Sequence, residues 1–548
     1  MRLLFLACLC FSVIFQTNGQ NKNIPPQRPK LVVGIVVDQM RIDYLYRYWN
    51  KFENNGFKKL VNEGAFYKNA HLNYIFTQTG CGHATIFTGA EPSVHGIVSN
   101  YWYLRSKKQK LYCCEDKNVT PVGSDTKKGN RSPVNMLAST VGDELRVSTL
   151  MKGKVIGVSL KDRAAILPAG HTANAAYWYD SDSGNMITSS HYMKQLPKWV
   201  LDFNAKKLAD VYLDRLWTPL LPIEQYTESL PDSNKFEYGF GNGQSVFPYD
   251  LAFISKKDKT SRNYEVLMDT PFGNTLTKDF AIATIMNEEL GKDDIPDMLT
   301  VSFSSTDYMG HRYNPYSVEM EDVYLRLDKE IAHLIEFIET EVGKENVVIF
   351  LTADHGSSQH PDYMKSIKYP QGKFNPSYSM TLLKSYLNAV YGQGEWVMEY
   401  IDGQIYLNHN LIEDSKLSLK EVQEKTADFM IQFNGIANAM SAYSMVNTPF
   451  SDGIFKFMQN SFNQERSGDV FINLRPGWVE ESSIYMVNHN TPYSYDTNVP
   501  LIFYGWKIPR QTVYQKVNIT SIAPSISFML NISTPNGCTS NILTNLFN

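Results

Sequence analysis

Two pairs of aspartate and histidine stand out in this chain, Asp354 with His355 and Asp307 with His311. Each pair follows a continuous apolar run of the kind that forms a buried strand, and a third such run leads into Asp38. In open α/β sheets, ligands collect beyond the carboxyl ends of the strands, so these side chains are expected to converge on one pocket. Carboxylates and imidazoles suit Zn²⁺, and the pattern therefore predicts a metal site.

The spacing within each pair sets a condition on the local backbone. Asp307 and His311 are four residues apart, so they share one face if the chain turns helical there. Asp354 and His355 are adjacent, so an irregular turn has to aim both side chains inward. Any one such pair more often belongs to a capped turn or a surface loop, and their joint placement at strand ends is what favours metal.

Thr79 precedes small residues and then a helix-like run that ends at Gly89. This pattern places its hydroxyl at a helix N-terminus, where backbone N–H groups and the helix dipole favour an anion. The simpler interpretation is a helix N-cap, because a threonine hydroxyl is a weak nucleophile until a base or a metal activates it. A neighbouring metal could supply that activation.

Two cations, Lys161 and Arg163, follow a strand-like run at 154–160. If the chain stays extended, positions two apart point the same way, and both side chains could meet one anionic group. Charged residues after a strand more commonly form a solvated loop. Asn100 is a further candidate donor, and it carries no charge.

The elements that must position these residues are visible as apolar periodicity. Helical patterns, notably over 320–342, alternate with strand-like runs. This alternation predicts an α/β fold, a doubly wound and mostly parallel sheet with helices on both faces. Two long stretches, at about 167–277 and 360–475, are expected to be inserted caps. The strand candidates are 31–37, 154–160, 298–303, 346–351 and 500–504.

Composition limits the classes of protein to consider. The chain has 548 residues, of which 43% are hydrophobic and 20% charged, as in a globular protein with a large core. Its formal net charge of -4 lacks the basic excess that non-specific nucleic-acid binding requires. Nucleic acid is therefore not expected as a structural partner.

The start of the chain is typical of a secretory signal peptide. Arg2 precedes the apolar run 3–15, and a small residue, Gly19, follows it. We predict a signal peptide at 1–19 that is cleaved after about Gly19. A membrane anchor is the alternative, but a run of roughly 13 residues is shorter than the ~20 that span a bilayer. The mature protein is therefore expected in the periplasm or secreted, with no stable membrane anchor.

The cysteines give no metal or disulfide framework. Their spacing matches no zinc ribbon or finger, and an exported setting permits disulfides without requiring them. Their pairing stays open. The four that remain after cleavage are Cys81, Cys113, Cys114 and Cys538.

Six segments together resemble the alkaline phosphatase superfamily, specifically the PafA-type bacterial alkaline phosphatases that share a core with nucleotide pyrophosphatases/phosphodiesterases. The match runs in order over nearly the whole mature chain, so residues 20–548 resemble one catalytic domain with insertions. The set is specific, although DHG alone would be weak. The segments are VVDQMR around Asp38, HATIFTG after Thr79, PSVHGIVSN ending at Asn100, SLKDRAAILPAGH, SSTDYMGHRYNP and LTADHG.

The resemblance implies a function and a set of roles. It implies two Zn²⁺, phosphate monoesters as small-molecule substrates, and a phosphothreonine intermediate at Thr79. It implies that Asn100, Lys161 and Arg163 contact the non-bridging oxygens of the phosphoryl group. It also implies that one zinc is bound by Asp38, Thr79, Asp354 and His355, and the other by Asp307, His311 and His489.

This sequence departs from the family pattern in two places. His489 lies in a less distinctive setting than the other ligands, and His360 is the alternative position. Asn498 stands where relatives often have histidine, which would alter the surroundings of the ligands. The remaining histidines are expected to be structural or solvated, and they include His71, His83, His95, His171 and His333.

Three other functions remain to be weighed. A phosphodiesterase would share the dinuclear centre, but two cations beside the phosphate favour the more highly charged monoester. A sulfatase needs a Cys or Ser in a C/SxPxR context, which this sequence lacks. An exported binding protein without catalysis is opposed by the intact Thr79 and ligand set. The oligomeric state is open, with a monomer as the first expectation.

Overall fold

The computed structural model describes residues 27–240, 243–258, 261–481 and 487–547. The predicted signal peptide at 1–19 lies outside these residues. Within them, no helix is both long enough and apolar enough to cross a membrane.

A mixed sheet of 11 strands forms the centre of this part of the chain. At its middle, β12 (Val347–Thr352), β1 (Leu31–Val37), β11 (Asp297–Phe303) and β6 (Val155–Ser159) lie side by side in that order and run parallel. The sheet continues beyond β6 through β7 (Ala175–Asp180), β8 (Asn185–Ser189) and β5 (Pro121–Val122). Every residue of β1 is buried, as its unbroken apolar run predicts.

The other flank of the sheet is where the strand directions change. The predicted strand 500–504 lies within β19 (Asn498–Gly505), which pairs antiparallel with both β12 and β2 (Ala65–His71). An apolar run shows burial on both faces but not direction, so the sequence could not tell this strand from its parallel neighbours. Beyond β2 lie β20 (Gln511–Val513) and β21 (Val517–Asn518). The mostly parallel, doubly wound α/β class predicted from the sequence is confirmed.

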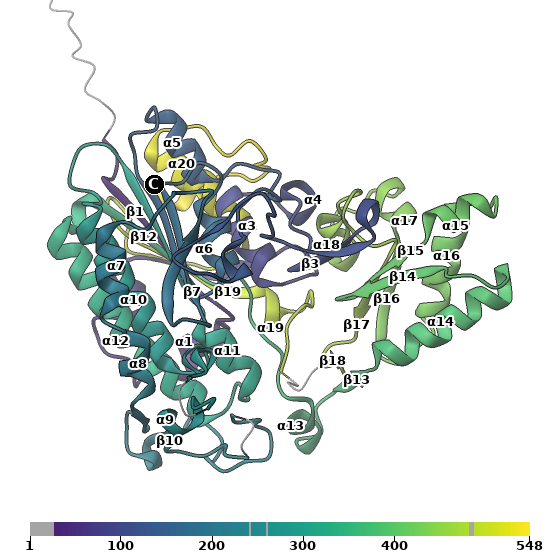
Figure 1. The fold of residues 1–548 in the computed structure, drawn as a ribbon, viewed down its shortest axis with the longest axis horizontal. Coiled ribbons are helices and arrows are strands. Elements are labelled where there is room, and N and C mark those ends of the chain that lie inside the picture. The colour runs from purple at the N-terminus through teal and green to yellow at the C-terminus, as the bar shows by residue number, and fades with distance from the viewer. Residues whose placement is uncertain (1–26, 241–242, 259–260, 482–486, 548) are drawn as a thin grey trace, which may run out of the picture.

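Helices cover both faces of the sheet because the connections run in opposite directions from its centre. The connection from β11 to β12 contains α12 (Val318–Glu341), whereas the connection from β6 to β7 contains α6 (Asp162–Ala169) and runs the other way. Right-handed crossovers then place these helices on opposite faces, and Figure 1 shows α12 with α10 (Pro271–Asn287) on one side. The α12 helix begins after Ser317, whose Oγ accepts a hydrogen bond from the Met320 N–H at 3.0 Å.

Close packing at the centre of the sheet requires one glycine. A Cβ on Gly34, in β1, would lie 2.7 Å from the Phe350 ring of β12 and 3.1 Å from Phe87 of α3 (Thr79–Thr88). Any larger residue would collide first with the Phe350 ring and then with Phe87, so this glycine allows both rings to pack against β1.

Part of the second long stretch folds into a separate lobe, drawn in green in Figure 1. Its sheet has the strand order β14-β15-β17-β16, and α14 (Pro376–Tyr391) and α16 (Leu419–Met430) accompany it over a hydrophobic core of its own. We call it the second lobe; its strands are β14 (Val397–Ile401), β15 (Gln404–Leu407), β16 (Ile436–Ser441) and β17 (Val470–Leu474). The first stretch, 167–277, contributes β7 and β8 to the main sheet as well as peripheral helices.

Candidate metal centre and phosphate site

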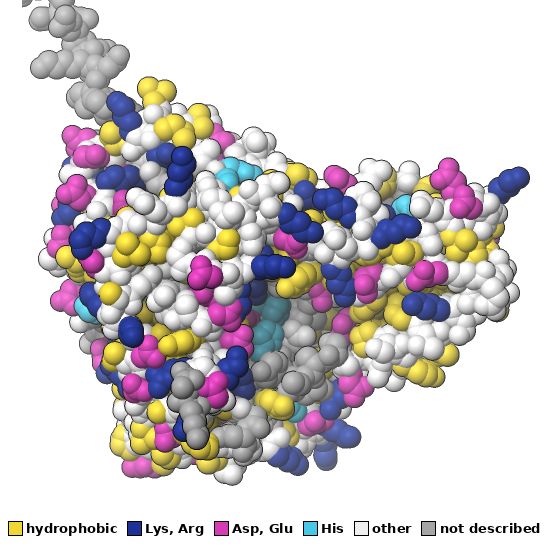
Figure 2. Space-filling view, in the orientation of Figure 1, with side chains coloured by type: hydrophobic (Ala, Val, Ile, Leu, Met, Phe, Trp, Pro, Cys, Tyr) yellow, Lys and Arg dark blue, Asp and Glu magenta, His cyan; other side chains and the backbone are white. Residues whose placement is uncertain are grey.

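The carboxyl ends of the central strands bring the predicted polar residues to one edge of the sheet. Asp38 follows β1 directly, and Asp354 and Lys161 each follow their strands, β12 and β6, by two residues. Helix α11 (Ser305–Arg312) begins just after β11 and carries Asp307 in its first turn. Since β1 lies between β11 and β12 in parallel register, these residues end up side by side. Figure 2 shows histidine side chains in the hollow between this edge and the second lobe.

One group of ligand atoms is fully buried. Single ligand atoms of Asp38, Asp307 and His355 all lie within 4.8 Å of one another. His355 Nε2 lies 3.6 Å from Asp38 Oδ1 and 3.5 Å from Asp354 Oδ2. All three of these atoms are buried without a hydrogen-bond partner among the described residues. Buried polar atoms are normally satisfied, so this set of orphaned oxygens and a nitrogen fits a cation.

A second group lies next to the first. Its members Asp307, His311 and His489 also offer ligand atoms within 4.8 Å of one another. His311 Nε2 lies 3.3 Å and His489 Nε2 3.8 Å from Asp307 Oδ1. Asp307 and His311 share a face of α11, which is the geometry that their spacing of four implies. The alternative position His360 instead accepts a hydrogen bond from the Asp362 N–H at the start of α13 (Pro361–Ser366).

Backbone carbonyl groups orient both histidines of this second group. His311 Nδ1 lies 2.9 Å from the Val487 oxygen, and His489 Nδ1 lies 2.5 Å from the Thr77 oxygen. A ring whose Nδ1–H is donated to a carbonyl presents its Nε2 lone pair to a metal. The His489 ring also stacks on His355, with centroids 3.7 Å apart, so it joins the two groups.

Lys161 connects the two groups electrostatically. Its Nζ lies 2.7 Å from Asp38 Oδ2 and also forms an ion pair with Asp307. Burial, followed by the charge of Asp354, raises the pKa of Asp38 well above its usual range. Burial acts in the same direction on Asp307, but Lys161 and His311 outweigh it and hold the pKa of Asp307 well below its usual range. So many carboxylates in one buried place favour a bound cation.

His489 is held in the form that can bind a metal. Burial, and then the neighbouring His355 and His311, lower its pKa well below the usual value. The ring is therefore neutral at pH 7, and a neutral imidazole is the form that coordinates. The least distinctive ligand of the sequence pattern thus lies in a setting suited to that role.

Thr79 opens α3, as its sequence pattern implies, but it is not the N-cap. That position belongs to Gln78, whose side chain makes no cap hydrogen bond. The Thr79 hydroxyl instead faces two cations, with Oγ1 at 3.3 Å from Lys161 Nζ and 3.5 Å from Arg163 Nη2. Asn100 is the third residue here, and its Oδ1 accepts a hydrogen bond from the Gly80 N–H at 2.9 Å.

Lys161 and Arg163 reach Thr79 by a different route from the one expected. The chain does not stay extended, because α6 begins at Asp162 with Lys161 as its N-cap residue. The two side chains still meet because Lys161 leaves from the strand end and Arg163 from the first turn of the helix. The condition of an extended backbone is therefore not met beyond Lys161, yet both cations lie within reach of one hydroxyl.

A hydrogen-bond chain that the sequence pattern did not indicate supports Arg163. Its Nη1 donates to the Tyr112 hydroxyl at 3.3 Å, and that hydroxyl donates to Asp162. Asp162 in turn accepts from Arg131 Nε at 2.8 Å. Tyr112 and Arg131 lie about 50 and 30 residues before Arg163, so no local spacing could have linked them.

Two further supporting residues were also missed. His83, expected to be structural or solvated, places Nδ1 3.3 Å from Asp354 Oδ2 and Nε2 2.9 Å from Ser302 Oγ. Gln39 donates through its backbone N–H to Asp354 and through Nε2 to Asp307, at 3.1 and 2.7 Å. A usable signal existed for His83, since it lies four residues after Thr79 on one helix face.

The cysteines and Asn498 were the other features singled out in the sequence. The thiols of Cys81, Cys113, Cys114 and Cys538 are free, and the Cys113 and Cys114 sulfurs are 4.0 Å apart. Asn498 begins β19 opposite His71, and its Oδ1 is buried without a hydrogen-bond partner among the described residues.

Comparison with known proteins identifies the family. A family model described as type I phosphodiesterase / nucleotide pyrophosphatase matches residues 32–495. This chain belongs to that family.

Several individual members of the family are similar to this chain over nearly its whole length. Alkaline phosphatase PhoV of Synechococcus elongatus is 39% identical over 553 residues, which cover 99% of each chain. Alkaline phosphatase PafA of Elizabethkingia meningoseptica is 40% identical over 529 residues, or 96% of each chain. A crystal structure of PafA matches with a TM-score of 0.90 at 39% identity, over 95% of this chain and 99% of that one. A Myroides odoratus protein named calcium-transporting ATPase is 39% identical over 515 residues, or 93% of each chain. The predicted PafA-type resemblance is confirmed.

Proposed function

We propose that this protein is an alkaline phosphatase, which hydrolyses phosphate monoesters to an alcohol and inorganic phosphate. Relatives named alkaline phosphatases that match nearly the whole chain support this activity. The observation that carries it is the position of Thr79, whose hydroxyl lies within 3.5 Å of both Lys161 and Arg163 at the edge that gathers the ligand groups.

In this proposal Thr79 is the nucleophile. Its Oγ1 loses its proton and attacks phosphorus, so an O–P bond forms on the threonine while the bond from phosphorus to the alcohol oxygen breaks and that oxygen takes up a proton. Water then attacks the phosphothreonine, frees inorganic phosphate and restores the hydroxyl. Phosphoryl transfer needs little from the protein besides positioning and charge stabilisation. Lys161, Arg163 and the Asn100 amide serve that purpose at the non-bridging oxygens.

Two Zn²⁺ are the proposed cofactors. When bound, they would lower the pKa of the Thr79 hydroxyl and stabilise charge on the attacking and leaving oxygens. The orphaned atoms of the first ligand group and the carbonyl-oriented histidines of the second support this assignment. The proposed ligands are Asp38, Thr79, Asp354 and His355 for one ion and Asp307, His311 and His489 for the other.

A phosphodiesterase is the second candidate, because the family model carries that description. A diester has one negative charge fewer than a monoester and a second organic group. Two cations within reach of the nucleophile therefore favour the monoester. A binding protein without catalysis is opposed by the presence of Thr79 beside those cations.

The test compares kcat/KM on an aryl phosphate monoester and on a diester with the same leaving group, alongside zinc quantification. We expect the monoester to be the better substrate, with about two zinc ions per chain. ATP belongs in the same assay, because one relative is named an ATPase and release of its terminal phosphoryl group uses the same chemistry. A faster diester reaction would reverse the assignment, and the Thr79→Ala variant measures any contaminating phosphatase.

We also propose that the protein is exported, to the periplasm or the medium, as a monomer. The predicted signal peptide supports export, and N-terminal sequencing of the mature protein should begin at about residue 20. Light scattering measures the molar mass of the purified protein in solution and so tests whether it is a monomer. Retention of residues 1–19 in the mature protein would contradict the export proposal.

A further inference from the structure

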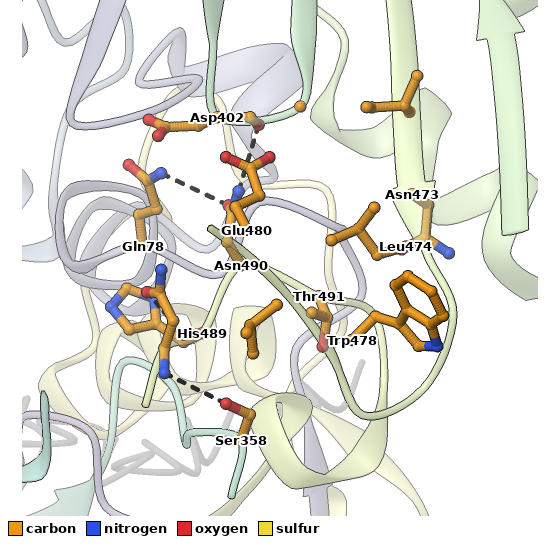
Figure 3. A pocket seen from close by; sticks show the side chains of 14 residues that line it. Gln78, Ser358, Asp402, Asn473, Leu474, Trp478, Glu480, His489, Asn490 and Thr491 are labelled. Carbon is orange, nitrogen blue, oxygen red and sulfur yellow. Dashed lines mark hydrogen bonds between the residues drawn. The ribbon is translucent and has the colours of Figure 1, made fainter. Parts of the chain in front are cut away.

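A cavity of about 80 Å³ lies beside His489, between the α/β core and the second lobe. Figure 3 shows Gln78 and His489 on one side of it and Asn473, Leu474 and Trp478 on the other. Its walls come from segments far apart in the sequence: the start of α3, the turn between β14 and β15, the end of β17, β18 (Trp478–Glu480), and 488–491.

The cavity adjoins the proposed reaction site. Gln78 lines it and is the residue directly before Thr79. His489 also lines it and belongs to the second ligand group. The cations Lys161 and Arg163 do not line it. A phosphoryl group held by those cations would therefore leave the rest of the ester, its alcohol part, to enter this cavity.

The size of the cavity limits what it can hold. Cavity volume is taken here as the space open to the centre of a water-sized sphere, and one water molecule needs about 10–15 Å³ of it. A cavity of about 80 Å³ therefore accommodates several waters or one small alcohol. The cavity therefore fits the alcohol part of a small phosphate ester.

One wall of the cavity is fixed by two glycines. A Cβ placed on Gly372 or on Gly435 would lie 2.2 Å from ring atoms of Trp478. The indole is thus held between two backbone segments, and its neighbour Leu474 adds a second apolar surface. A wall packed this closely gives the cavity a defined shape, which is a condition for discriminating among ligands.

The charge of the cavity is negative. Asp402 and Glu480 both line it, and none of the lining residues is a lysine or arginine. Asp402 Oδ2 accepts from Ser99 Oγ at 2.9 Å, and Glu480 accepts from the Tyr400 hydroxyl. Among the described residues, no ion pair reaches either carboxylate, so both are held by neutral donors alone.

A cationic ligand in the cavity would change the protonation of Glu480. Burial raises the pKa of Glu480 to about 7, with the Tyr400 hydrogen bond acting to lower it and the charge of Asp402 to raise it. A positive group in the cavity would favour the ionised form of this carboxyl, and the ionised form would attract the positive group. An anionic group would meet the opposite effect.

We infer that this cavity binds the alcohol part of the substrate and favours phosphate monoesters of small amino alcohols. The inference rests on the proposed function. Such a substrate is negative at its phosphoryl end and positive at the other, which matches cations at Thr79 and carboxylates in the cavity. Esters with a second anionic group are disfavoured, and esters of neutral alcohols are intermediate.

The test measures kcat/KM for three small monoesters, 2-aminoethyl phosphate, 2-hydroxyethyl phosphate and the phosphate ester of 3-hydroxypropanoate. The variants are Asp402→Asn, Glu480→Gln and their combination, which keep the shape of each side chain and remove its charge. Because each ester is compared between wild type and variant, the intrinsic reactivity of its leaving group cancels. Glu481→Gln is the matched control, since it removes a charge next door at a residue outside the cavity.

In the double variant, we expect kcat/KM for 2-aminoethyl phosphate to fall about 10-fold relative to kcat/KM for 2-hydroxyethyl phosphate, as for loss of a partly buried charge interaction. The carboxylate ester should gain, and the Glu481→Gln ratios should stay at the wild-type values. Equal ratios in wild type and double variant, or an equal fall in Glu481→Gln, would overturn the inference while monoester hydrolysis itself stands. If wild type hydrolyses an aryl phosphate monoester but none of the three small esters, the inference alone fails; if it leaves the aryl monoester intact as well, the proposed function fails and the inference fails with it.

Discussion

His83 Nδ1 lies 3.3 Å from Asp354 Oδ2, and both side chains are completely buried. The same imidazole reaches the Ser302 hydroxyl with Nε2, so the ring is fixed at both ends. Its Nδ1 also lies 2.9 Å from the Thr79 carbonyl oxygen, its hydrogen-bond partner, so the ring packs behind a proposed zinc ligand and beside the proposed nucleophile. Partners of this kind orient the ligand and set its affinity, and their loss typically costs about 10- to 100-fold in metal affinity.

We predict that His83→Asn lowers zinc affinity by about that factor. Activity should fall at limiting zinc and return when zinc is in excess, because the ligands themselves remain. Titration of the apoprotein with zinc, read by both binding and activity, measures this. His333→Asn, an exposed histidine on α12, is the control. An unchanged zinc affinity in His83→Asn would show that this contact is only structural.

A second prediction concerns metal removal. Prolonged chelation should abolish activity, and zinc should restore it better than magnesium, since imidazole and carboxylate together suit zinc. The measurement is activity against bound metal during dialysis and reconstitution. Full activity in protein shown to be free of metal would contradict the dinuclear proposal.

The third prediction follows from Thr79. Acid quenching during turnover should trap phosphate on Thr79, and Thr79→Ala should lose both the trapped species and most of the activity. Thr79→Ser should keep part of the activity because it keeps a hydroxyl. Peptide mapping of the quenched enzyme locates the phosphate. Phosphate found on another residue would remove Thr79 from this role.

The fourth prediction separates monoesters from diesters. Arg163→Ala should slow monoester hydrolysis by about 10² to 10³, the usual effect of losing one preorganised donor at a reacting oxyanion, and should slow diester hydrolysis much less. Lys161→Ala should act in the same direction, with a smaller effect on the monoester. In the double variant, the rate losses from Lys161→Ala and Arg163→Ala are not expected to add, because neighbouring cations on one phosphate act as a unit.

Tyr112→Phe is the companion variant to this prediction. It removes the hydroxyl that accepts from Arg163 at 3.3 Å but leaves both cations in place. It should therefore cost less than Arg163→Ala on the monoester. Equal losses on monoester and diester in all of these variants would mean that the residues support the fold or the metals and not the choice of substrate.

The sequence predicted the central strands well because each is buried on both faces. β1, β6, β11 and β12 match their predicted runs to within one residue at each end. The direction of β19 could not be predicted, since burial alone does not distinguish parallel from antiparallel pairing. The insertion boundaries stay a prediction.

Contacts between distant segments were the part that the sequence could not predict. The ligand candidates Asp38, Asp307 and Asp354 were visible because each follows a strand. His489 was indicated only by the family resemblance, and Tyr112 and His83 act through contacts that exist only in the folded state. The turn into α6 after Lys161 shows the same limit, because periodicity places an element but leaves its first residues uncertain. The cavity beside His489 joins segments from both ends of the chain and has no local signal at all.

A last prediction concerns stability and pH, and it rests on Glu319 in α12. This carboxyl is fully buried, its Oε1 accepts from the Tyr249 hydroxyl at 2.6 Å, and its Oε2 has no hydrogen-bond partner among the described residues. Burial raises its pKa from 4.5 to about 8, and the nearby Asp232 acts in the same direction. The folded protein therefore binds this proton more tightly than the unfolded chain does. The stability that results is complete below about pH 4.5 and is lost as the pH rises through about 8.

Glu319→Gln keeps an acceptor for Tyr249 and removes the group that titrates. Between pH 6 and pH 9 its free energy of unfolding should therefore fall less steeply than that of the wild type, and each pKa unit of difference corresponds to about 1.4 kcal/mol. Urea unfolding at pH 6, 7, 8 and 9 measures both proteins, and Glu336→Gln, an exposed position on the same helix, is the control. If the wild type and Glu319→Gln lose stability in parallel over this range, then Glu319 is already ionised in the folded protein. A cation or a water molecule would then have to satisfy its second oxygen.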